Sequence, residues 1–302
     1  MGKIKTIIVV VIVLYLISLL SSKLITSNFK EEIISNGIAI IKIDGTIVPT
    51  ERNSILGTGY VDSDSVLANL KKADENSGVK AIILEINSGG GAVVASKEIA
   101  DKVRSIKKPT IALIREVGAS GAYWVASSAD VVIADELSIT GSISVVASYL
   151  EYSGLLDKYN ITYESLTTGK YKDTGSPFKE LTNEERNLLL KKLNIIQERF
   201  IQDIARNRNM TVEKVRELAT GMIFLGIEAK ELGLIDELGN RETAIDKAKE
   251  LANLKKEKVI EYIKKPSLLH IFDKLTAESF YSMGQGLGDS LKSEEEFKIL
   301  AK

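Results

Sequence analysis

Two turns rich in small residues carry the residue types that nucleophilic catalysis requires. Residues 87–91 (Asn-Ser-Gly-Gly-Gly) follow an apolar segment that ends at Ile86, and residues 117–122 (Val-Gly-Ala-Ser-Gly-Ala) contain Ser120. Glycines let backbone N–H groups point into open space, so the first turn could stabilise a developing oxyanion. A plain tight turn or a phosphate cradle would have a similar composition, although no Gly-Lys-Ser/Thr follows as a P-loop requires.

Ser120 lies between small residues at the start of an expected helix. Its hydroxyl would be accessible there and would feel the positive end of the helix, a placement that resembles a nucleophile elbow. Ala122 interrupts the full Gly-x-Ser-x-Gly pattern, and a serine beside glycine also serves as an ordinary N-cap. The local sequence therefore leaves both roles open.

A serine nucleophile needs a general base, and histidine is almost absent. The one histidine, His270, has apolar neighbours that indicate an amphipathic surface helix. The base must then be a carboxylate or a lysine whose pKa is lowered by burial, and lysine is the better-attested partner. The chain has 40 lysines and arginines, so chemistry alone does not choose among them.

Composition excludes several other classes of protein. The absence of cysteine excludes disulfides, thiol nucleophiles and thiolate metal sites, and one histidine cannot build a His-rich metal site. The 40 basic and 41 acidic side chains nearly cancel, and no long basic run offers a surface for nucleic acid. We therefore expect no metal, no cofactor and no nucleic-acid partner.

Strand-like and helix-like segments alternate from residue 38 onward, which is the rhythm of βαβ units. The pattern predicts an α/β fold with a largely parallel, buried sheet. The strand-like segments are 38–43, 79–86 and 110–114, with shorter ones near Val131, near Val145 and at 258–263; the helices start near Asp64, Ala92 and Ser120.

The second half of the chain is more helical. Thr182 and Glu185 have the spacing of a capping box, which predicts the start of a long helix. Apolar residues then recur at helical spacing, and such a stripe is typical of packing. The stripe consists of Leu189, Leu193, Ile196, Phe200 and Ile204.

The N-terminal segment is apolar enough to span a bilayer. Residues 7–20 carry no charge, and Lys3 and Lys5 precede them, so we expect a transmembrane helix at about 6–22 with the rest of the chain outside the cytoplasm. A cleaved signal peptide is the alternative, but the run is long for one and no small-x-small cleavage site follows. The expected domains are an anchor at 1–28, a catalytic domain at 36–264 and a helical tail at 265–302.

Several motifs in one order, spread between about residues 38 and 238, resemble the signal peptide peptidase A family. They are 86–91, 118–124, 140–143, 169–173 with 176–178 just beyond, and 233–238. The family's glycine-rich turn usually has proline after Asn-Ser, where this chain has Gly89. The turn should be more flexible here, while the following amides stay available.

By that resemblance Ser120 is the nucleophile and Lys172 is the base that takes its proton. Lys170, two positions away, is assigned to the rim of the site. Ser142 would orient the lysine ammonium, or would be a purely structural hydroxyl.

The resemblance also implies the oxyanion donors. These would be the N–H groups of Gly90 or Gly91 and of Gly121.

The fold implied by the resemblance is the Clp protease/crotonase-like spiral of ββα units, assembled into a homo-oligomeric ring. The chain has one copy of the motif set, as in the short form whose subunits each bring part of a neighbour's site. Whether serine and lysine then come from one chain or from two is left open.

The activity implied is that of a membrane-anchored serine endopeptidase, with its catalytic domain outside the cytoplasm, that degrades signal peptides and other membrane-associated peptides. A crotonase-like acyl-CoA enzyme is one alternative, but it would use carboxylates and have no need of an anchor. A catalytically silent membrane scaffold is another, although Ser120 and Lys172 are both retained.

Overall fold

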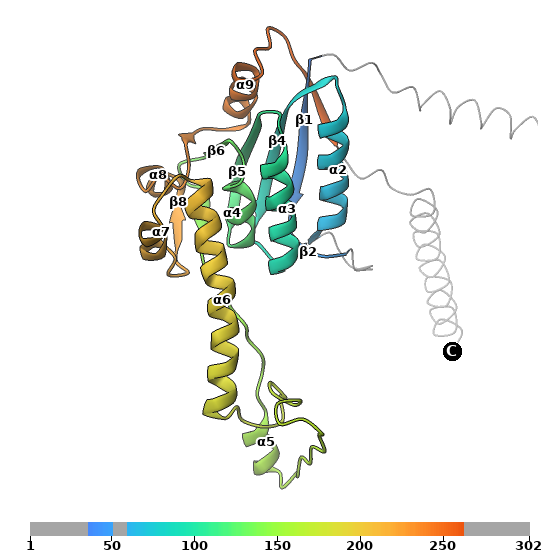
Figure 1. The fold of residues 1–302 in the computed structure, drawn as a ribbon, viewed down its shortest axis with the longest axis vertical. Helices are drawn as coiled ribbons and strands as arrows, with labels where there is room; N and C mark the ends of the chain where they lie inside the picture. Colours follow the sequence, from blue (N-terminus) through green and yellow to red (C-terminus); the bar gives the residue numbers. More distant parts are fainter. Residues whose placement is uncertain (1–35, 51–58, 263–302) are drawn as a thin grey trace, which may run out of the picture. The chain divides into compact units, whose positions relative to one another are not determined.

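The computed structural model describes residues 36–50 and 59–262, which belong to one compact unit (Figure 1). The expected membrane anchor, the segment around His270 and the C-terminal tail lie outside the described residues. No helix within the described ranges is long and apolar enough to cross a membrane.

A central sheet carries the fold. Among the described residues it has eight strands, in the order β10-β1-β4-β5-β6-β9, with β7 beside β5 and β8 beside β7. All of these pairs are parallel except β7 with β8, so the expectation of a largely parallel sheet is confirmed. The strands are β1 (Gly37–Asp44), β4 (Val79–Ser88), β5 (Thr110–Ala119), β6 (Val131–Ala134), β7 (Ile139–Gly141), β8 (Ile223–Leu225), β9 (Glu237–Leu238) and β10 (Lys258–Tyr262), and a separate pair consists of β2 (Thr46–Val48) and β3 (Tyr60–Asp62).

Helices cover both faces of the sheet because its central strands are apolar on both sides. Ile41 and Leu84 pack in the same cluster as the buried residues of α2 (Ser63–Glu75) and α3 (Val93–Ser105), whereas Ile40 packs on the opposite face with α9 (Arg241–Leu251). Figure 1 shows α2, α3 and α4 on one side of β1, β4 and β5. The remaining helices are α4 (Gly121–Ala126), α5 (Ser153–Lys158), α6 (Asn183–Asn207), α7 (Val212–Leu218) and α8 (Gly226–Glu231).

The strand expected around Val145 does not form, and that prediction is wrong. β7 ends at Gly141, and the next residue, Ser142, has a φ of 49°. The amide of Ser142 donates to the carbonyl of Met222 (2.8 Å) instead of continuing the ladder with β5. A positive φ turns the chain out of the sheet three residues before Val145.

Helix α6 starts as the sequence predicts. The Thr182 side chain accepts from the amide of Glu185, and the Glu185 carboxylate accepts from the amide of Thr182, so the capping box is confirmed. The apolar stripe is buried only in its second half, where Phe200 and Ile204 lie in the core, while Leu189 is 39% exposed. Leu193 and Ile196 are partly buried, so the burial of the stripe increases towards the C-terminal end of α6.

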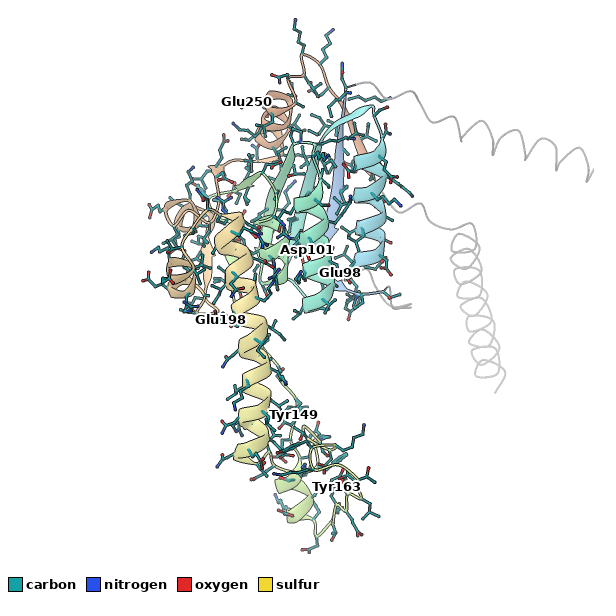
Figure 2. The ribbon with its side chains drawn as sticks, viewed as in Figure 1. Glu98, Asp101, Tyr149, Tyr163, Glu198 and Glu250 are labelled. Carbon is teal, nitrogen blue, oxygen red and sulfur yellow. The ribbon has the colours of Figure 1, made fainter. Side chains whose placement is uncertain are left out.

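The first half of α6 carries a segment that lies apart from the sheet. Figure 1 shows α6 running beyond the sheet, with α5 beside its N-terminal end. We call residues 146–182 together with the first half of α6 the arm. Figure 2 labels Tyr149 and Tyr163 in the arm and Glu198 higher on α6, beside the core.

Candidate active site

The two glycine-rich turns meet at one edge of the sheet. β4 ends at Ser88 and leads into α3, and β5 ends at Ala119 and leads into α4. These strands are parallel neighbours, with Ser88 opposite Gly118, so both turns leave the sheet at the same place. In parallel α/β sheets the carboxyl ends of the strands are where ligands bind.

Ser120 has a strained backbone conformation. Its φ is 54° and its ψ is −126°, which a non-glycine residue adopts at a cost of about 1–3 kcal/mol. Two hydrogen bonds hold it: its amide donates to the carbonyl of Gly141 (2.8 Å), and its carbonyl accepts from the amide of Trp124 (3.0 Å). Its side chain makes no cap to α4, which removes the ordinary N-cap role. A strained serine on a strand-to-helix turn is the arrangement of a nucleophile elbow.

The glycine turns are in direct backbone contact beside Ser120. A Cβ built on Gly90, whose φ is 96°, would lie 2.6 Å from the amide nitrogen of Gly121 and 3.0 Å from the Cβ of Ser120. A Cβ on Gly121 would lie 3.4 Å from the amide nitrogen of Gly91. Only glycine at these positions allows the two turns to approach so closely.

The hydrogen bonds of the turns distinguish between the proposed oxyanion donors. The amide of Gly90 donates to the Ser88 hydroxyl (3.1 Å) and is thereby occupied. Among the described residues, the turns' hydrogen bonds leave the amides of Gly91 and Gly121 without an acceptor. These two amides are therefore the better candidates to bind an oxyanion.

Ser142 lies beside Ser120. It directly follows Gly141, whose carbonyl accepts from the Ser120 amide, and Gly141 pairs with Ala119 across β7 and β5. Ser142 is thus near enough to influence whatever binds at Ser120. Ser142 is partly exposed, and both roles considered for its hydroxyl remain predictions.

Lys172 is far from Ser120 within the chain. The loop that contains Lys172 is held at the start of α6, because Thr174 donates to the Glu185 carboxylate (3.0 Å). The helix that follows Ser120, α4, contacts the other half of α6: Trp124 stacks on Phe200 with ring centroids 4.4 Å apart. Glu185 and Phe200 are fifteen residues apart on one helix, which corresponds to about 22 Å at 1.5 Å per residue. The structure brings together Ser120, the three glycines and Ser142, and it does not bring Lys172 to them.

The two lysines nearest to Lys172 are unsuited to act as bases. The Lys170 ammonium donates to the Glu184 carboxylate (2.7 Å), and this hydrogen bond holds the pKa of Lys170 above its ordinary value. The Asp173 carboxylate likewise raises the pKa of Lys179. None of the ion pairs among the described residues includes Lys172, which is exposed. Unlike Lys170 and Lys179, Lys172 is therefore not paired with a carboxylate among the described residues.

Glu185 is the centre of the polar cluster that orders the tip of the arm. Its side chain is 5% exposed and accepts from Lys179 and from the Thr182 amide, and these hydrogen bonds, the one from Lys179 first, lower its pKa to about 2. A carboxyl group whose pKa is lower in the folded than in the unfolded chain stabilises the fold at pH values above its unfolded pKa, about 4.3. This contribution is lost as the pH falls towards 2, the pKa of Glu185 in the fold.

We expect the arm to loosen before the core on acidification. The protection of the amides of residues 170–185, relative to an unstructured peptide at the same pH, should be high at pH 5 and fall progressively between about pH 4 and 2. Glu185→Gln should show fast exchange at pH 5 already, while the exposed Glu180→Gln should behave as wild type. Equal protection of the arm at pH 5 and pH 2.5 would contradict this role of Glu185.

Ser96 is a residue near the site that the sequence analysis did not single out. It lies in the first turn of α3, it is fully buried, and its hydroxyl has no hydrogen-bond partner among the residues that the structure describes. A Cβ on Gly121 would lie 2.3 Å from the Ser96 Oγ, so Ser96 packs directly against the candidate oxyanion turn. A serine in a helix interior carries no sequence signal for this position.

Comparison with known proteins identifies the class of fold and the family. The Clp protease family matches residues 51–134, the range that contains both glycine turns, so the fold and the site define an α/β protein of the Clp protease type. Peptidase family S49 matches residues 102–255, which is half of the chain. The chain belongs to peptidase family S49, the signal peptide peptidase A family, and it is a protease.

Individual relatives are similar over most of their length. The chain is 37% identical to a provisionally named protease of Methanocaldococcus jannaschii, over 76% of this chain and 73% of that protein. It is 36% identical to a provisionally named signal peptide peptidase SppA of Enterococcus faecium, over 79% of this chain and 70% of that protein. A solved structure of an alanine-for-serine variant of the 1510-N membrane-bound stomatin-specific protease matches with a TM-score of 0.48 and 15% identity, over 76% of this chain and 99% of that one.

Proposed function

We propose that the protein is a serine endopeptidase in which Ser120 is the nucleophile. The observation that carries this proposal is the strained backbone of Ser120, held beside the unoccupied amides of Gly91 and Gly121. A nucleophile and a pair of oxyanion donors at one sheet edge are the parts that acyl transfer requires.

In this mechanism the neutral amine of Lys172 takes the proton of the Ser120 hydroxyl while Oγ attacks the scissile carbonyl. The amides of Gly91 and Gly121 donate to the oxyanion of the tetrahedral intermediate. The lysine ammonium then gives its proton to the leaving amine, the C–N bond breaks, and an acyl-enzyme remains. Water, deprotonated by the same lysine, hydrolyses the ester and releases the acid.

The lysine comes from a neighbouring subunit of a homo-oligomeric ring. Support comes from the separation of about 22 Å along α6, which a lysine side chain cannot bridge. The arm also exposes apolar side chains that an isolated soluble protein would bury, among them Leu150 (70% exposed) and Leu166 (89% exposed). Contact with a second copy would cover them and would bring Lys172 to the neighbour's Ser120.

The substrates we propose are signal peptides and other membrane-associated peptides, cut outside the cytoplasm. Support comes from the relative named as a signal peptide peptidase and from the apolar residues 7–20, which would anchor the chain in the bilayer. Val94, which is exposed in the first turn of α3, would favour apolar substrate side chains, whereas Ala122 is fully buried and does not contact the substrate.

The proposal is tested by following cleavage of a fluorogenic apolar peptide by the full-length protein in detergent between pH 6 and 10. Ser120→Ala and Lys172→Ala should each lower kcat by about 10³-fold or more while the protein stays folded. Wild-type activity should rise with pH through one ionisation well below the value of about 10.4 of a free lysine. Wild-type rates in Ser120→Ala would refute the proposal.

A further inference from the structure

The helix that begins beside Ser120 is joined to the arm helix by a buried polar contact. The indole Nε1 of Trp124 in α4 donates to the carboxylate of Asp203 in α6 (3.2 Å), and the Trp124 ring stacks on Phe200. Asp203 is fully buried, and it also pairs with Arg199 (3.3 Å) and Arg206. The contact is thus both apolar and charged.

A second polar contact lies one turn further along α6. The Asn207 side-chain amide donates to the hydroxyls of Ser127 (3.2 Å) and Ser128 (3.0 Å). Both hydroxyls donate in turn to the carbonyl of Trp124. Asp203 and Asn207 therefore hold the C-terminal half of α6 against α4.

The first half of α6 has no comparable support from the core. Between Asn183 and Arg199 only Glu185 is buried, and its partners belong to the arm itself. From Asp203 to Glu185 the helix is about 27 Å long, so a tilt of about 5° at Asp203 would move the arm tip by about 2 Å. A misplacement of about 1 Å can cost on the order of 100-fold in rate.

Burying the Asp203 carboxylate between two helices costs free energy, because the charge loses its contact with water. An ion pair in the interior often stabilises a fold no better than apolar residues of the same size would. The directional hydrogen bond from the Trp124 indole does, however, fix the angle between α4 and α6, which apolar packing fixes less sharply. Arg199 and Arg206 lie on α6 itself, so their ion pairs orient the Asp203 carboxylate within its own helix.

We propose that Asp203 is a positioning residue for the base of the neighbouring site: by holding α6 on Trp124, it sets the angle of the arm that delivers Lys172 to the next subunit. This inference rests on the proposed function, in which serine and lysine come from different subunits. Asp203 of one chain would therefore affect the active site of the neighbouring subunit, which receives Lys172 from that chain.

Mixed oligomers test this assignment. Lys172→Ala chains contribute only the nucleophile, and Ser120→Ala chains contribute only the base. In an oligomer of both, every functional site therefore combines Ser120 of a Lys172→Ala chain with Lys172 of a Ser120→Ala chain. Asp203→Asn is added to one of the two chains at a time. Trp124→Phe is a second variant, which keeps an aromatic ring beside Phe200 and removes the indole N–H. Glu198→Gln is the matched control, because Glu198 lies on the same helix as Asp203 and also pairs with an arginine, Arg216 of α7 (2.8 Å), but its side chain is 45% exposed.

We expect either variant to lower kcat of the mixed oligomer by about 10-fold or more when it is on the base-donating chain, with little change in KM. On the nucleophile-donating chain it should lower kcat by less than about threefold, and Glu198→Gln should have no such effect on either chain. Equal losses in both placements, or a loss only on the nucleophile-donating chain, would overturn the assignment. If the unmodified pair is inactive, the two-subunit site itself fails, and the inference fails with it.

Discussion

Mixing two inactive variants should restore proteolysis. Ser120→Ala and Lys172→Ala chains, dissociated, mixed in equal amounts and reassembled, should regain about one quarter of wild-type activity, because half of the sites have an intact serine and half of those receive an intact lysine. The physical reason is the length of α6: about 22 Å of helix separates Glu185, next to the loop of Lys172, from Phe200, which packs on α4 of the same chain.

The measurement is cleavage of the fluorogenic peptide before and after reassembly. Each variant treated alone in the same way is the control, and a chain with both substitutions mixed with either single variant should stay inactive. If the mixture of single variants gains no activity while mass photometry shows mixed oligomers, the lysine does not come from a neighbour.

Substitution of Gly90 should nearly abolish activity. Gly90→Ala would place a Cβ 2.6 Å from the amide nitrogen of Gly121 in a backbone conformation that alanine rarely adopts. The Gly121 amide must shift, and loss of one oxyanion donor costs about 10²–10³-fold in kcat. The strain should also lower the stability by about 1–3 kcal/mol.

Gly89→Ala is the matched control for this prediction. It lies one residue earlier in the same turn, and a Cβ there meets nothing within 4 Å. Its kcat/KM should stay within about threefold of wild type, since surface substitutions have small effects. A folded Gly90→Ala variant with wild-type kcat/KM would show that the contact of the two turns does not matter for catalysis.

The sheet and the glycine turns could be predicted because they depend on local patterns. The apolar runs at 38–43, 79–86 and 110–114 became β1, β4 and β5, and the capping box at Thr182 starts α6. In each of these cases the neighbouring residues alone decide the structure.

Other features depend on tertiary contacts that no local pattern encodes. Val145 has strand-like neighbours, but Ser142 turns the chain away towards Met222. Leu189 is part of a regular apolar stripe, yet the core of this chain covers α6 only around Phe200 and Ile204 and does not extend to Leu189. The periodicity identified the apolar face of the helix but not what covers that face. The resemblance named Lys172, and only the structure shows how far the lysine lies from Ser120.

Labelling of the nucleophile tests the central claim most directly. The full-length protein is treated with a fluorophosphonate, which phosphonylates activated serines, and the adduct is located by peptide mass spectrometry. We predict a single adduct on Ser120 that is absent from Ser120→Ala and slowed in Gly90→Ala. An adduct on another residue, formed at the same rate in Ser120→Ala as in wild type, would contradict the assignment of Ser120 as the nucleophile.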